Sequence, residues 1–253
     1  MGGKEIMPKF CLKYLLILFV SIGINGCKKS NDTSPSGGGT TGVGGSLARF
    51  TIANDHLYTI SENDITVFNV SEANDPIKKN TVPLGFGIET IFPKGNNLFI
   101  GTQFGMKILD IANPVKPVEI SNYQHIRSCD PVVAEGNYAY VTLRDGNACA
   151  RGLKELQVVD ITNLRQPILF KSYPMTQPFG LAIDGKKLFI CDQGIKYYDA
   201  TKPGDLKLIK TFNVSAEDLI ANDGILMAIG SDGLNQYDYS TDNLVFLSRI
   251  PTL

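Results

Sequence analysis

Three carboxylates hold equivalent places in a repeated pattern, because Glu89, Asp130 and Glu217 each stand at the start of a short apolar stretch. Acids that converge on one pocket can bind Ca²⁺, attract a cationic ligand or act as general acid and base. Carboxylate pairs at roughly 5 to 9.5 Å also carry out glycoside hydrolysis. A plainer alternative is that polar residues occupy the wet end of a strand, with Asp218 taking the inward place beside Glu217. The fold must decide whether these positions meet.

The elements that would position these acids recur five times. Each repeat has a short apolar strand centred on an aromatic residue or Met, followed by a strand that ends in Asp or Asn. The strand centres are Tyr58, Phe99, Tyr140, Phe189 and Met227, and the closing residues are Asn69, Asp110, Asp160, Asp199 and Asp238. A period of about 41 residues with several strands and no helix predicts an all-β fold, a five-bladed β-propeller with four antiparallel strands per blade.

The second repeat shows how one blade would be built. Its expected strands cover residues 89–92, 97–102 and 106–111, and a fourth begins near Pro117. The Gly95-Asn96 pair supplies the positive φ angles of a tight hairpin. The first strand of a blade lies nearest the axis, so the side chains that enter it should ring the mouth of a central channel, here called the funnel face. The Asp or Asn that closes each third strand should accept N–H bonds from the following turn rather than act as an acid.

The third repeat carries about nine extra residues, 144–152, between its second and third strands. Both this insertion and the segment before Asp130 should lie on the funnel face. A disulfide between Cys129 and Cys149 would join them, closing a loop of about 20 residues and adding about 3 kcal/mol in the chain-entropy model. The insertion is either a contact surface or an idle, stabilised loop. The expected ligand-contacting residues are Glu89, Asp130, Glu217, His125, Arg127, Arg144 and Arg151.

The remaining reactive side chains have plainer interpretations. His125 and His56 have no neighbour at metal-ligand spacing, so both are expected to be ordinary surface histidines. Cys191 falls inside an apolar strand, where a cysteine usually behaves as a small buried residue. We assign no catalytic residue and no metal ligand from the sequence.

The beginning of the chain predicts export and anchoring. Residues 1–26 read as a signal peptide, since lysines precede an apolar run too short to span a bilayer. Residues 27–46 are dominated by Gly, Ser and Thr and should form a flexible tether, which leaves residues 47–253 for the propeller. The small residues before Cys27 resemble the bacterial lipobox. That resemblance implies a lipid-modified Cys27 and a membrane-anchored lipoprotein of the bacterial cell envelope, at the outer membrane.

Two of the repeats also resemble a known family. Val158-Val159-Asp160-Ile161 followed by Gln166-Pro167-Ile168, and Ile108-Leu109-Asp110-Ile111 followed by Lys116-Pro117-Val118, resemble the LVIVD repeat of bacterial, often lipid-anchored, surface proteins. The similarity extends over all five repeats and weakens in the last two. The resemblance implies a propeller and provides no catalytic residues to transfer.

Composition narrows the function further. The net charge is −1 and the folded region has no basic cluster, so nucleic acid is not an expected partner. No cofactor is expected, although Ca²⁺ at the funnel acids stays open. The sequence favours a non-enzymatic binding or structural module that recognises an envelope protein or glycan through its funnel face. The alternative is a carbohydrate-active or other hydrolase that uses Glu89, Asp130 and Glu217.

Overall fold

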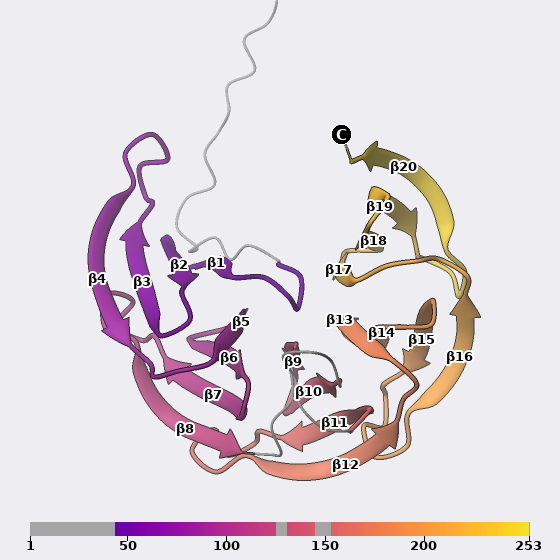
Figure 1. The fold of residues 1–253 in the computed structure, drawn as a ribbon, viewed down its shortest axis with the longest axis horizontal. Helices are drawn as coiled ribbons and strands as arrows, with labels where there is room; N and C mark the ends of the chain where they lie inside the picture. The colour runs from indigo at the N-terminus through magenta and orange to yellow at the C-terminus, as the bar shows by residue number, and fades with distance from the viewer. Residues whose placement is uncertain (1–43, 125–130, 145–152, 253) are drawn as a thin grey trace, which may run out of the picture. The chain divides into compact units, whose positions relative to one another are not determined.

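Every regular element in the described part of the chain is a β-strand. The computed structural model describes residues 44–124, 131–144 and 153–252. Its strands form five sheets of four, and each sheet pairs its strands antiparallel in chain order. Figure 1 shows the sheets around a common centre, with the first strand of each innermost and the fourth outermost. This arrangement confirms the predicted five-bladed propeller.

The blades divide the chain evenly. Blade 1 contains β1 (Phe50–Ala53), β2 (His56–Ile60), β3 (Asp64–Asn69) and β4 (Ile77–Pro83). Blade 2 contains β5 (Ile88–Lys94), β6 (Asn97–Thr102), β7 (Gly105–Asp110) and β8 (Val118–Gln124). Blade 3 contains β9 (Val132–Glu135), β10 (Tyr138–Leu143), β11 (Glu155–Asp160) and β12 (Ile168–Pro174). Blade 4 contains β13 (Pro178–Asp184), β14 (Lys187–Asp192), β15 (Ile195–Asp199) and β16 (Lys207–Phe212). Blade 5 contains β17 (Asp218–Asn222), β18 (Ile225–Gly230), β19 (Gly233–Asp238) and β20 (Val245–Pro251).

The turns between the first and second strands contain Gly, Asn or Asp, as the sequence predicted. In blade 2 the hairpin closes on the pair Lys94–Asn97, and Gly95 between them has a φ of 55°. In blade 1 the equivalent turn places Asn54 and Asp55 at φ 52° and 57°, which only a few residue types tolerate. Tight two-residue turns therefore fix the register of the two inner strands in each blade.

The acids that close the third strands have the structural role that we expected. Their Oδ1 atoms accept the backbone N–H of the residue two positions later. The four bonds are Ala112 to Asp110 at 2.7 Å, Thr162 to Asp160 at 2.8 Å, Thr201 to Asp199 at 2.8 Å and Ser240 to Asp238 at 2.6 Å. Asn69 does the same for Ser71 at 3.2 Å. These hydrogen bonds lower the carboxyl pKa of Asp160, Asp199 and Asp238.

The hydrophobic core consists of four clusters, one at each junction between consecutive blades. Tyr58 and Ile65 of blade 1 pack with Leu98 of blade 2, for example, and Cys191 of blade 4 packs with Leu219 of blade 5. Cys191 is 1% exposed, as the sequence predicted. Because each blade buries both of its faces only when it has two neighbours, sequential packing stabilises the inner blades most.

The first and last blades are joined differently. No strand pairing connects β1–β4 with β17–β20 in the part of the chain that the structure describes. Phe50 of β1 and Ile229 of β18 are exposed, at 62% and 36%. The connection is made near the axis instead, where Ser46 and Leu47, just before β1, hydrogen-bond to Asp218 at the start of β17.

Candidate funnel-face site

Asp218, at the start of β17, is a buried carboxylate that binds the segment before β1. Its Oδ1 accepts the Ser46 hydroxyl at 2.8 Å and the Ser46 N–H at 3.2 Å, and its Oδ2 accepts the Leu47 N–H at 3.1 Å. The Ser46 hydroxyl oxygen accepts the Leu181 N–H at 2.8 Å. Burial raises the carboxyl pKa of Asp218, although the hydrogen bonds from Ser46 and Leu47 oppose that change. This cluster of Ser46, Leu47, Leu181 and Asp218 is called the axial latch below.

Two glycines leave the room that Asp218 needs. A Cβ added at Gly45 would lie 2.1 Å from Asp218 Oδ2, and one added at Gly180 would lie 2.3 Å from its Oδ1. Ser46 is fully buried, so the packed region begins before the boundary at Leu47 that composition suggested. Gly/Ser-rich composition marks a flexible tether only where no buried acceptor is within reach.

Two of the three predicted funnel acids, Glu89 and Glu217, belong to the described residues, and the cleft that Glu89 lines does not include Glu217. Glu217 is exposed, and its neighbour Asp218 takes the inward place, which was the alternative left open by the sequence. Glu89 is half-buried in β5 and lines a cleft between blades 1 and 2. The other predicted contacts, Asp130, His125, Arg127 and Arg151, lie outside the described residues, as do both partners of the Cys129–Cys149 disulfide.

The cleft at Glu89 has a volume of about 320 Å³. Its lining residues are Arg49, Glu62, Phe86, Gly87, Ile88, Glu89 and Gln103. They come from the segment before β1, the β2–β3 turn, the entry to β5 and the β6–β7 turn. All of these segments lie on the funnel face. The cleft thus combines one guanidinium, two carboxylates, an amide and an exposed phenyl ring.

A second hollow of about 230 Å³ adjoins the first, and Phe86 lines both. Its lining residues are Leu84, Gly85, Phe86, Thr102, Phe104, Lys107, Asn122 and Gln124. Phe86 is 67% exposed and Phe104 is 44% exposed. The two hollows and Phe86 between them are called the Phe86 cleft below.

Backbone hydrogen bonds hold the loop that carries Phe86. Leu84 and Ile88 donate to the carbonyls of Asn63 and Glu62 at 2.8 and 3.1 Å, which ties the loop to blade 1. On the blade 2 side Gln103 donates to the Gly87 carbonyl at 2.9 Å. Gly85 and Gly87 have φ values of 92° and 84°, in the region that favours glycine. The loop is fixed at both ends, so Phe86 is displayed by a rigid support.

Arg144, the described residue of the predicted insertion surface, contacts the neighbouring blade. Its guanidinium lies 4.7 Å from the centre of the Phe179 ring, a cation–π distance. Thr142 donates its hydroxyl to the Phe179 carbonyl at 2.7 Å. Arg144 therefore helps to join blades 3 and 4, whatever it contributes to ligand contact.

A second buried acid on the funnel face is structural. Asp192, at the end of β14, is fully buried and accepts the Lys196 ammonium at 2.6 Å and the Gln177 N–H at 2.6 Å. Burial raises the carboxyl pKa of Asp192, but the hydrogen bonds from Lys196, Gln177 and Thr176 outweigh it, so the pKa is lowered overall. Asp192 fixes the loop that enters blade 4.

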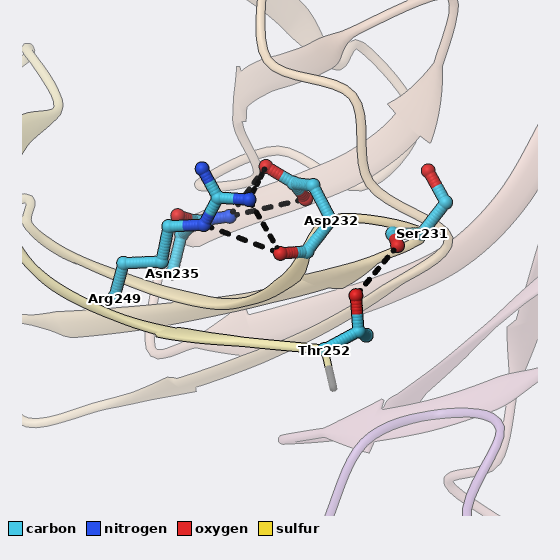
Figure 2. Close-up of polar contacts among 5 residues, drawn as sticks. All are labelled: Ser231, Asp232, Asn235, Arg249 and Thr252. Atoms are coloured by element: carbon cyan, nitrogen blue, oxygen red, sulfur yellow. Dashed lines mark hydrogen bonds and ion pairs between the residues drawn. The ribbon is translucent and has the colours of Figure 1, made fainter.

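In blade 5 the equivalent turn, between β18 and β19, takes part in a network of hydrogen bonds and an ion pair at the surface. Figure 2 shows Arg249 of β20 donating to the Asp232 carbonyl, at 2.7 Å from Nη2, with the Asp232 carboxylate 3.5 Å away. Thr252 donates to the Ser231 carbonyl at 3.3 Å. These contacts tie the β18–β19 turn to the outer strand. An ion pair this exposed adds little stability.

Another hollow, of about 480 Å³, lies on the opposite face between blades 2 and 3. Its lining includes Asp110, Thr162 and Asn163, residues of the turns that follow the third strands. Asp110 and Asn163 already accept N–H bonds from Ala112 and Arg165. This hollow is therefore a by-product of the turn structure, and the Phe86 cleft offers the richer chemistry.

Within residues 44–124, 131–144 and 153–252, no three His, Cys, Asp or Glu side chains are grouped to hold a metal ion. The same residues include no helix long and apolar enough to cross a membrane. His56 is 8% exposed, and its Nδ1 lies 2.7 Å from the Asn54 carbonyl oxygen. The prediction of a surface histidine there was wrong, because position 56 opens β2 and packs inward.

Sequence reasoning selected Glu89 and passed over Arg49, Glu62 and Phe86. A signal was available in Gly85-Phe86-Gly87, where an aromatic residue stands between two glycines just before a first strand. An aromatic residue in a short, glycine-flanked connection cannot be part of a strand's buried face. When such a residue is exposed, it is either apolar surface without a function or a residue that contacts a ligand.

A family model for the LVIVD repeat matches residues 90–125 and 126–175, which correspond to blades 2 and 3. The chain is a five-bladed propeller that contains LVIVD repeats. The sequence-level match covers two blades, and the structure extends the same architecture to the other three. No curated protein matches this LVIVD-repeat propeller.

Solved structures share its fold at low sequence identity. A protein from Lactobacillus plantarum has a TM-score of 0.61 and 13% identity, over 78% of this chain and 69% of the other. A putative 6-phosphogluconolactonase from Bacteroides fragilis has a TM-score of 0.58 and 12% identity, over 78% and 68%. The computationally designed Ika8 protein has a TM-score of 0.56 and 14% identity, over 78% and 59%. The LVIVD-repeat propeller thus spans about six to seven tenths of the length of these proteins, and the likeness concerns the fold alone.

Proposed function

We propose that the LVIVD-repeat propeller is a non-enzymatic binding module of the bacterial cell envelope that holds its ligand in the Phe86 cleft. The observation that carries the proposal is the display of Phe86. Phe86 is 67% exposed on a loop fixed to both neighbouring blades, and it lines two hollows that also contain polar side chains. Concave sites with an aromatic contact and a few placed polar groups are typical of ligand recognition.

Anchoring follows from the sequence pattern around Cys27. A lipid on this cysteine would attach the chain to the membrane, and a Gly/Ser/Thr-rich tether would let the funnel face reach ligands in the envelope. Labelled palmitate should be incorporated into the wild-type protein and not into Cys27→Ala. The variant should move from the membrane fraction to the soluble fraction, and a variant that stays membrane-bound would remove the anchor.

A capture experiment tests the binding function. Full-length protein carrying an affinity tag is incubated with solubilised envelope material, and retained proteins and glycans are identified by mass spectrometry. Wild-type protein should retain a partner that Phe86→Ala loses. Phe246→Ala is the matched control, because Phe246 is 56% exposed on β20 of blade 5. Equal retention by all three proteins would refute the assignment of the cleft.

Hydrolysis is the second candidate, on the basis that Glu62 and Glu89 line the same cleft. Two carboxylates beside a bound sugar are the minimum for glycoside cleavage. The hypothesis that Glu89, Asp130 and Glu217 act together is weaker, because Glu217 is exposed and does not line that cleft. Release of reducing sugar by wild type and not by Glu89→Gln would establish an enzyme, and binding without turnover would establish the module.

A further inference from the structure

The Phe86 cleft presents two partly exposed phenyl rings on adjoining loops. A Cβ added at Gly87 would lie 3.4 Å from Phe104 Cε2 and 3.4 Å from Gln103 Cβ, so the β6–β7 turn packs closely over this glycine. Other large aromatic side chains near the inner strands, such as Tyr58, Phe99 and Phe189, are fully buried in the core clusters. Phe86 contributes little to the core and offers a flat apolar face to solvent.

The polar groups around these rings are planar or multidentate. Arg49, Glu62, Glu89 and Gln103 line one side, while Thr102, Asn122 and Gln124 line the other. Guanidinium, carboxylate and amide groups can each bond to two adjacent hydroxyl groups at once. A ligand with an apolar face and a rim of hydroxyls, such as a pyranose ring, matches this combination.

The charges within the cleft are mixed. Arg49, Glu62 and Glu89 line one hollow, and Lys107, which lines the other, is paired with Glu119 at 2.7 Å. A strongly anionic ligand would meet the two carboxylates, and a strongly cationic one would meet Arg49. A neutral ligand would meet neither repulsion. The two hollows, of about 320 and 230 Å³, share Phe86 in their linings, which suits an extended ligand with successive units.

From these features we infer that the ligand is a neutral oligosaccharide of at least two sugar units. One unit stacks on Phe86, and its neighbours occupy the hollows on either side, with their hydroxyls bonded to the polar lining. This inference rests on the proposed binding function and names the class of ligand.

The test measures binding of defined sugars to the full-length protein by calorimetry, in a detergent without a sugar headgroup. Cellotetraose, mannotetraose and maltotetraose are the neutral probes, and tetragalacturonate and chitosan tetramer are the charged ones. At least one neutral probe should bind, and its affinity should fall tenfold or more in Phe86→Ala. Phe86→Trp should retain binding, since the larger ring keeps the stacking surface, and Phe246→Ala should bind like the wild type.

Two results would overturn the inference. One is binding confined to the charged probes, and the other is neutral binding that Phe86→Ala leaves unchanged. Capture of an envelope protein that depends on Phe86, with no neutral sugar bound, would keep the proposed function and reject the oligosaccharide. Circular dichroism of Phe86→Ala should match the wild type, because the side chain is exposed, so a loss of binding reports on the contact.

Discussion

Asp218 is the residue on which the centre of the fold depends most directly. Replacement by Ala would remove the acceptor of the buried Ser46 hydroxyl and N–H and of the partly buried Leu47 N–H. We expect the free energy of unfolding to fall by about 2–4 kcal/mol for Asp218→Ala and by about 1–2 kcal/mol for Ser46→Ala. Urea denaturation measures both. The double variant should lose less than the sum of the two, because the residues share hydrogen bonds; strict additivity would contradict the axial latch.

The two buried acids should respond to pH in opposite directions. Because the carboxyl pKa of Asp218 is raised in the folded state, the folded protein binds this proton more tightly than the unfolded chain does. The contribution of Asp218 to the free energy of unfolding is therefore largest below about pH 4 and falls as pH rises. The lowered pKa of Asp192 gives a contribution that is present above about pH 4 and is lost as pH falls. The stability of Asp218→Asn relative to wild type should therefore improve with rising pH, and that of Asp192→Asn should worsen. Parallel slopes in thermal unfolding from pH 3 to 7 would refute the assignment.

The choice between Glu217 and Asp218 shows where prediction from single residues stops. The alignment of the repeats places Glu217 at the position of Glu89. A shift of one residue along the strand would bring Asp218 inward instead of Glu217. Space left by Gly45 and Gly180 settles that choice in favour of Asp218. These glycines are far from Asp218 in the sequence, so no local pattern could show that they meet it.

At the scale of elements, the acid after each third strand is a turn residue that Asn can replace. Asp110 is partly exposed and accepts the Ala112 N–H at 2.7 Å. Asp110→Ala should lower the free energy of unfolding by about 1 kcal/mol, whereas Asp110→Asn should cost less than half as much, since Asn69 does the same in blade 1. Chemical denaturation of both variants provides the comparison. An Asn variant as unstable as the Ala variant would show that charge matters there.

Strands and turns were predictable because their patterns are local and recur. The strand predicted at residues 97–102 of the second repeat has the same ends in the structure. The two-residue turns follow from Gly, Asn and Asp at equivalent positions of the repeats. The register shift between third and fourth strands, as at Ile108 and Leu109, recurs in every blade and was missed. A bulge needs one extra residue and leaves no distinctive composition in an exposed outer strand.

For the whole molecule, the axial latch links the two ends of the propeller without a shared blade. Ser46 and Asp218 lie 172 residues apart in the chain, a separation that no repeat pattern could connect. Compared with a protein that lacks residues 1–43, one that lacks residues 1–47 should have a free energy of unfolding lower by about 2–4 kcal/mol, because the hydrogen bonds of Ser46 and Leu47 are lost. Urea midpoints of the two shortened proteins give the difference. Equal midpoints would mean that the latch adds no stability.

The central claim is that the Phe86 cleft is the surface on which the protein meets its ligand. A photoreactive benzoylphenylalanine at position 86, and separately at the matched position 246, can be irradiated in living cells, and the adducts identified by mass spectrometry. The structure predicts a defined adduct at position 86 and none at position 246. Absence of any adduct at position 86, or the same adducts at both positions, would contradict the claim.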